Sequence, residues 1–258
     1  MPTHSRIRGP QRWAFNFTLK ERCTFERIEN PPDIELRTER NNNGTVGIIG
    51  FEITVPSRSQ KKARNSAVTQ AYRLKDILAL LSKQYIDCSL TGEAIIRPDG
   101  SRKLLTQTTI RSHRRGTAKA TNLGRRKFPS LITGLNLQPS LQNLVEGFKN
   151  ANNGLEAYEN ERYELMIREF YLVIEEEVDA KRFPKGDKYK FLRHAVSHAG
   201  VLNNSTINGL SDPKYFPKGY FDLPNNRFDH YSSKNQKNVK KEAKKLMRIA
   251  LNQLRQQL

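Results

Sequence analysis

The sequence has few of the residues that build disulfide frameworks, metal clusters or membrane spans. Its two cysteines, Cys23 and Cys88, have no partner spacing, which argues against a disulfide framework or a cysteine-based zinc site and fits a reducing compartment. No run of about eighteen apolar residues occurs, and residues 1–30 contain no apolar core of a signal peptide. We therefore expect a cytoplasmic protein with no membrane partner.

Acidic residues are also scarce relative to basic ones. The chain has 45 Lys and Arg against 26 Asp and Glu, a net charge of +19. Residues 1–128 carry 25 basic and 11 acidic side chains, or +14, and residues 129–258 carry 20 and 15, or +5. This excess attracts polyanions, so nucleic acid is the expected partner, bound mainly by the N-terminal half. The alternative interpretation is a folded domain with an excess of basic residues on its surface that do not bind a specific partner.

The N-terminal half alternates strand and helix patterns. Residues 12–21 place Trp13, Phe15, Phe17 and Leu19 at every second position, which predicts a half-buried strand. After a polar turn at residues 41–44, VGIIGFEITV predicts a buried strand that Pro56 closes. Apolar residues spaced by three and four predict an amphipathic helix over residues 67–86. A hairpin turn at Pro98-Asp99-Gly100 completes a small basic α+β domain over residues 1–130.

The C-terminal half has the composition of a helical domain. We place the boundary near residues 128–136 and expect an all-α domain over residues 136–258, so the fold class is α+β. The expected helices cover residues 140–151, 154–178, 191–200 and 235–258. The segment 203–233 is expected to be irregular. Its aromatic residues could stack unpaired bases or could simply pin the loop onto the helices.

Residues 97–127 hold ten Lys and Arg against one acid, Asp99. Such a run cannot be buried, so it forms either a solvated loop or a surface for phosphates. The second interpretation predicts a nucleic-acid-binding surface that comprises Arg111, Arg114, Arg115, Lys119, Arg125, Arg126 and Lys127.

The stretch FLRHAVSHAG, residues 191–200, puts Arg193, His194 and His198 on an otherwise apolar helix. Ordinary surface side chains are one interpretation. A metal site is a second, but there is no HExxH motif and no third ligand, so we expect no metal and no other cofactor. The third is acid–base chemistry on a phosphate, since a guanidinium binds phosphate oxygens and an imidazole exchanges protons near neutral pH. Arg193 and His198 differ by about 140° on a helical wheel, so one straight helix does not aim both at one spot.

Arg193, the polar His194, three further positions and His198 resemble the signature of the HEPN superfamily. The arrangement of a basic domain before the helical domain also resembles that of HEPN proteins that act on RNA, including the ApeA-like group. The resemblance implies a helical bundle over residues 136–258 that forms a homodimer with two facing motif helices. It also implies a metal-independent ribonuclease in which Arg193 stabilises the phosphorane, His198 moves protons and His194 orients or assists. Such sites recruit an acidic or polar residue from the preceding helix, for which Glu175 is the candidate.

The resemblance leads to the hypothesis of an RNA endonuclease, for which a role in defence or as a toxin would be suitable. The main alternative is a non-catalytic nucleic-acid-binding protein whose helical domain serves dimerisation or partner binding. A third is an assembly module that binds an acidic protein. The sequence leaves open the RNA substrate and whether an inhibitory partner protein restrains the activity.

Overall fold

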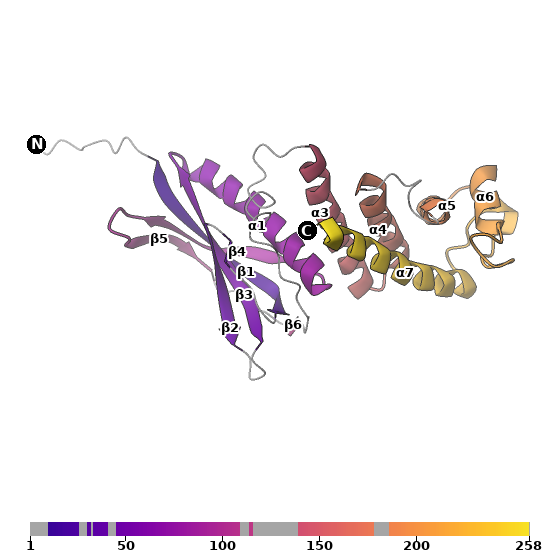
Figure 1. Cartoon of the computed structure of the whole chain (residues 1–258), viewed down its shortest axis with the longest axis horizontal. Helices are drawn as coiled ribbons and strands as arrows, with labels where there is room; N and C mark the ends of the chain where they lie inside the picture. The colour runs from indigo at the N-terminus through magenta and orange to yellow at the C-terminus, as the bar shows by residue number, and fades with distance from the viewer. Residues whose placement is uncertain are drawn as a thin grey trace, which may run out of the picture. The chain divides into compact units, whose positions relative to one another are not determined.

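The structure is a computed structural model that describes residues 10–25, 30–31, 33–40, 45–108, 114–115, 139–177 and 186–257 (Figure 1). The chain has an α+β fold and divides into two compact units. The sheet unit comprises residues 1–78 and 86–135, and the helical unit comprises residues 79–85 and 136–258. The domain boundary predicted near residues 128–136 lies outside the described residues.

The sheet unit contains antiparallel strands in the order β2-β3-β1-β4-β5, with β6 paired in parallel to β1. The strands are β1 (Gln11–Phe25), β2 (Ile34–Arg40), β3 (Val46–Ser57), β4 (Cys88–Ile96), β5 (Arg102–Gln107) and β6 (Arg114–Arg115). The two strands predicted from apolar patterns, β1 and β3, pair at the centre of the sheet. β2 was not predicted, because its outer half is polar and exposed.

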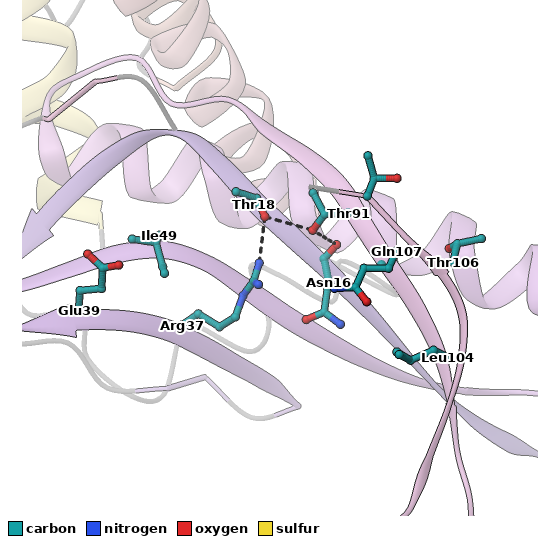
Figure 2. Close-up of a pocket in the computed structure, with 11 residues that line it drawn as sticks. Asn16, Thr18, Arg37, Glu39, Ile49, Thr91, Leu104, Thr106 and Gln107 are labelled. Carbon is teal, nitrogen blue, oxygen red and sulfur yellow. Dashed lines mark hydrogen bonds between the residues drawn. The ribbon is translucent and has the colours of Figure 1, made fainter. Parts of the chain in front are cut away.

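Apolar side chains from alternate positions of β1 build the core of the sheet unit. Phe15, Phe17 and Leu19 are fully buried, as the period-two pattern predicts. α1 (Gln60–Ser82) runs along one face of the sheet (Figures 1 and 2). Its buried residues include the predicted Ala71, Leu74, Leu78 and Leu81. The side chains between the apolar positions of β1, such as Asn16 and Thr18, therefore lie on the opposite face.

The bounds of two predicted elements differ in the structure. α1 begins at Gln60, earlier than predicted, because Ser59 caps it through its carbonyl and hydroxyl while the first turns are polar and exposed. It ends at Ser82, and Lys83 has a φ of 56°. β3 does not stop at Pro56 but continues to Ser57. β2 begins at Ile34, which pairs with Ile53 of β3. β2 therefore does not reach Pro56 and needs no backbone donor from it.

The predicted hairpin turn joins β4 to β5. The Arg97 amide donates to the Ser101 carbonyl at 2.8 Å, and the Gly100 amide donates to the Arg97 carbonyl at 2.9 Å. Gly100 has a φ of 80°, which glycine adopts without steric cost. The prediction of a turn at these residues is confirmed.

The helical unit packs its helices around α4. The elements are α3 (Pro139–Glu159), α4 (Tyr163–Glu177), α5 (Gly186–Ser197), α6 (Asn204–Ser211), a 3₁₀ turn (Pro224–Asn226) and α7 (Ser233–Gln257). α4 contacts α3, α5 and α7, while α6 contacts α5. The apolar face predicted for the last helix is confirmed, since Val239, Ala243, Leu246, Ala250 and Leu254 are all fully buried.

The predicted long helix over residues 154–178 is wrong, because the chain breaks at Asn160–Arg162 and not before Gly154. Glu161 adopts a φ of 57°, and the Arg162 amide donates to the Ala157 carbonyl at 2.8 Å, which closes the end of α3. Gly154 lies inside α3, where a Cβ would come within 2.7 Å of the Phe170 ring. This glycine therefore permits close packing of α3 on α4 and does not end a helix.

Two further predictions in the helical unit are corrected. The helix that contains the 191–200 stretch ends at Ser197 and not at Gly200. The segment predicted to be irregular contains α6, whose first turn is capped by Asn203 accepting from the Thr206 amide at 2.8 Å. At the other end of α6, a Cβ on Gly209 would come within 2.1 Å of the Phe191 ring, so α6 lies tightly on α5.

Residues Ala79–Tyr85, which include the last turn of α1, belong to the helical unit. The Arg255 guanidinium on α7 donates through Nη2 to the carbonyls of Leu80 and Leu81, each at 3.1 Å. The carbonyls of a last helical turn have no partner within their own helix. Arg255 of α7 therefore donates to two carbonyl acceptors in the last turn of α1.

A buried ion pair connects α5 to α7. The Lys188 ammonium lies 2.6 Å from Glu242 Oε2, and the two side chains are only 9% and 2% exposed. Glu242 also accepts from the Tyr220 hydroxyl at 3.1 Å and from Lys245 at 2.9 Å. One carboxylate therefore holds together α5, α7 and the segment that follows α6.

Replacing Glu242 with Gln is expected to lower the free energy of unfolding by about 3–5 kcal/mol, because the buried Lys188 would lose the negative charge of Glu242. Urea denaturation of the full chain measures this. Glu146→Gln is the matched control, since Glu146 pairs with Lys149 on an exposed face and should change stability by less than about 1 kcal/mol. Equal stability of the two variants would contradict the role of the buried pair.

The same carboxylate should make the protein sensitive to acid. Burial raises the pKa of Glu242, but Lys188 and Lys245 outweigh burial and the pKa is lowered overall. A carboxyl with a lowered folded-state pKa stabilises the fold above its unfolded pKa of about 4.3, and this stability is lost as the pH falls towards the folded value. From neutral pH to about pH 3, the wild type should therefore lose more unfolding free energy than Glu242→Gln.

Candidate active site

α5 carries Arg193, His194 and, directly after its last residue, His198. Leu192, Ala195 and Val196 are buried and fix the inner face of the helix. Arg193 and His194 are half-buried, and His198 is exposed. We call these three side chains the Arg-His-His row.

Arg193 lies against α4. Its Nη1 is 3.2 Å from Glu175 Oε2 and 3.5 Å from Oε1, and its guanidinium carbon lies 5.1 Å from the centre of the Tyr171 ring. The Arg193 and Glu175 side chains are 38% and 43% exposed. The structure thus places the acidic residue singled out from the sequence beside Arg193. Tyr171 and Glu175 orient the guanidinium while part of it stays accessible to solvent.

His194 lies between the other two members of the row. Its ring centre is 4.1 Å from that of His198, and its Nδ1 is 3.0 Å from Thr206 Oγ1 on α6. The pKa of His194 is lowered by burial and then by the positive charges of His198 and Arg193. Since an ordinary histidine has a pKa of 6.5, His194 is neutral at pH 7.

Arg193 and His198 do not bind each other directly. No hydrogen bond or ion pair joins them within the part of the chain that the structure describes. Arg193 is held by α4, whereas the His198 ring lies against the His194 ring at a tilt of 38°, which agrees with their separation on the helical wheel. The positive charges of both groups nevertheless lower the pKa of His194.

His230 was not predicted from the sequence. Its Nδ1 lies 3.0 Å from both carboxylate oxygens of Glu164, and its Nε2 lies 3.3 Å from the His198 carbonyl. Gln236 Nε2 donates to Glu164 Oε1 at 2.9 Å and to the His230 carbonyl at 2.6 Å. Both neighbours of the His230 ring are acceptors, so the ring nitrogen is the donor in either contact. His230 therefore positions the backbone of His198.

The predicted nucleic-acid-binding residues fall almost entirely outside the described part of the chain. This applies to Arg111, Lys119, Arg125, Arg126 and Lys127. Arg114 and Arg115 form β6, which pairs with Glu21 and Arg22 of β1. The basic binding surface thus stays a prediction.

The aromatic segment after α6 is mostly a core. Phe216, Phe221 and Phe228 are buried and contact one another in sequence, with ring centres 5.1 Å and 5.6 Å apart. These rings pin the loop onto the helices, and they are not available to stack bases. Tyr231 differs, since it is 97% exposed.

Among the described residues, no group of three or more His, Cys, Asp or Glu side chains could hold a metal ion. Cys23 and Cys88 are buried free thiols, and burial raises the pKa of each to about 12. No helix in the described ranges is long and apolar enough to cross a bilayer. No family model, curated protein or solved structure matches the chain.

Replacing Arg193 with Gln should raise the pKa of His194 towards its ordinary value, because one of the positive charges that lower it is removed. The rise is partial, since burial and His198 remain. A pH titration of the His194 ring by NMR measures the change. Lys190→Gln is the control, because Lys190 is an exposed cation on the same helix that is not among the causes of the shift. An unchanged His194 pKa in Arg193→Gln would contradict the coupling within the row.

Proposed function

We propose that the chain is a cytoplasmic, metal-independent RNA endonuclease of the HEPN type, with the Arg-His-His row as its active site. The observation that carries the proposal is the arrangement of Arg193, His194 and His198 at the accessible end of α5, with Glu175 beside Arg193. The two buried free thiols fit a reducing compartment.

The proposed reaction needs a proton acceptor, a proton donor and a group that binds the charged phosphate. The 2′-hydroxyl attacks the adjacent phosphorus and loses its proton, while the bond from phosphorus to the 5′-oxygen breaks and that oxygen gains a proton. The products are a 2′,3′-cyclic phosphate and a 5′-hydroxyl. His198 moves protons, and the neutral His194 orients it or assists by accepting one.

Arg193 would stabilise the negative charge that builds up on the phosphorane. A guanidinium has five donors, and the described structure commits Nη1 to Glu175. The contact with Glu175 is solvent-exposed, so exchanging it for a phosphate costs little. Glu175 and Tyr171 would hold the planar group in place before the substrate binds, which lowers the cost of ordering it.

A homodimer through the helical unit would complete the site. Arg193 is held on α4 and the His198 ring lies against the His194 ring, so within one chain Arg193 and His198 make no direct contact. A two-fold axis beside α5 would let Arg193 of one protomer face His198 of its partner. The basic sheet unit would bind the RNA strand, as its charge predicts.

A non-catalytic nucleic-acid-binding protein is the second candidate. The ion pair between Arg193 and Glu175 favours it, because a structural arginine on a helix surface would make the same contact. The helical unit would then serve only dimerisation or partner binding.

The purified chain, incubated with labelled RNA in EDTA, should cut the RNA. His198→Ala should reduce the cleavage rate by about 10²–10⁴-fold, because general acid–base catalysis contributes this much. Arg193→Ala should reduce it by about 10²–10³-fold, as expected for loss of a group that stabilises the transition state. A substrate with deoxyribose at the scissile position should not be cut, since it lacks the nucleophile.

Lys190→Ala, at an exposed position on the same helix, is the matched control and should cut normally. Retained RNA binding without cleavage by any form would favour the non-catalytic candidate. Cleavage that persists in both Arg193→Ala and His198→Ala would show that the active site lies elsewhere.

A further inference from the structure

The face of the sheet opposite α1 contains a cavity of about 630 Å³ that is lined by polar and apolar groups (Figure 2). This volume lies within the range of about 300–1,000 Å³ typical of ligand pockets. Five strands contribute to the lining, which consists of Asn16, Thr18, Arg37, Glu39, Ile49, Thr91, Gly92, Leu104, Thr106 and Gln107 together with Thr108. The cavity belongs to the sheet unit alone.

A guanidinium lies on the floor of this cavity. Arg37 Nη2 donates to the Phe17 carbonyl at 2.6 Å and to Thr18 Oγ1 at 3.1 Å. A Cβ on Gly50 would come within 2.5 Å of Arg37 Nη2 and 3.1 Å of its Cζ. The absence of a side chain at Gly50 therefore lets the Arg37 guanidinium rest directly on the sheet. Two β1 acceptors fix its position, so it can present its planar face to a ligand.

Hydroxyl groups extend this fixed polar floor. Thr18 Oγ1 and Thr91 Oγ1 are 3.1 Å apart, and Thr91 Oγ1 donates to the Asn16 carbonyl at 3.2 Å (Figure 2). Thr91 is buried. The chain of bonds from Arg37 through Thr18 and Thr91 to the backbone of β1 orients these groups in advance of any ligand.

Neutral donors and acceptors line the rim. The structure gives no hydrogen bond to the carboxamides of Asn16 and Gln107 or to the Thr106 hydroxyl within the described residues. Asn16 is half-buried, whereas Thr106 and Gln107 are exposed on β5. Each carboxamide offers donors and acceptors side by side. Leu104, which is 62% exposed, adds an apolar contact.

These features select against two ligand classes. A phosphate favours several cationic donors, whereas here a single arginine lines the cavity, its Nη2 already donates to two β1 acceptors, and a carboxylate, Glu39, also lines the cavity. An apolar ligand would cover the carboxamides of Asn16 and Gln107 without giving them partners. A flat, polar ligand that carries both donors and acceptors on its edge satisfies them.

We propose that this cavity binds an unpaired nucleobase of single-stranded RNA, with Arg37 stacking on its face and Asn16 and Gln107 reading its edge. Bases splayed out of single strands are commonly recognised by stacking on arginine planes and by hydrogen bonds to their edges. This inference rests on the proposed function and names the element that selects the substrate. The strand backbone would bind elsewhere on the basic surface, while the cavity supplies sequence preference.

The test measures binding of labelled adenine, cytosine and uracil decamers, and of an abasic decamer, by fluorescence anisotropy. The full chain carries His198→Ala so that RNA is not consumed. We expect it to prefer one homopolymer by about 5- to 100-fold, the discrimination that a good bidentate contact provides. Asn16→Ala and Gln107→Ala should each reduce the preference, and the double variant should abolish it without changing the salt dependence of binding.

Lys103→Gln is the matched control, because Lys103 is exposed on β5 and does not line the cavity. It should weaken binding of all decamers equally and keep the preference. Gln107 is also exposed, so Gln107→Ala tests the proposal without disturbing the fold. Equal binding of all four decamers, a preference that survives the double variant, or an acidic peptide that displaces RNA from the cavity would each overturn the proposal.

The outcome is separable from that of the proposed function. RNA cleavage without base preference would refute the cavity proposal and leave the nuclease intact. Base preference in a chain that never cuts RNA would support the cavity and refute the nuclease.

Discussion

The contact between Lys188 and Glu242 holds the helix with the Arg-His-His row in place. α5 has only 12 residues, too few to be stable as an isolated helix. A buried pair costs much desolvation and contributes little net stability, but it is directional and fails if either partner moves. Since Glu242 also binds Tyr220 and Lys245, this one carboxylate holds the first turn of α5 against α7. Arg193 and His194 lie further along the same helix.

Sequence periodicity predicted those elements whose apolar residues recur on one face, such as β1 and α7. It failed where a break depends on a single backbone conformation. Glu161 ends α3 with a positive φ, although nothing in its side chain demands one. Gly154 looked like a helix start but is a packing contact with Phe170, which only the neighbouring helix reveals. α6 was missed because eight residues give too short a pattern.

In the candidate site, the residues that were predicted lie close together in the sequence, and those that were missed lie in later segments. Arg193, His194 and His198 share one short segment, so their spacing on a helix was readable. Glu175 could be named because it lies on the helix before. Thr206 and His230 come from later segments, and the fold brings them to the row through a capped turn and a loop. No spacing rule connects such residues to the motif, and the Arg37 cavity depends on strand register in the same way.

The hydrogen bonds from Arg255 to the carbonyls of Leu80 and Leu81 determine how this chain can be divided into fragments. The helical unit is assembled from two separate stretches of chain. A fragment that begins at Asn136 would lack Ala79–Tyr85 and leave the Arg255 guanidinium without its carbonyl acceptors. Division of the chain at the junction that the sequence marks would therefore produce an incomplete helical unit.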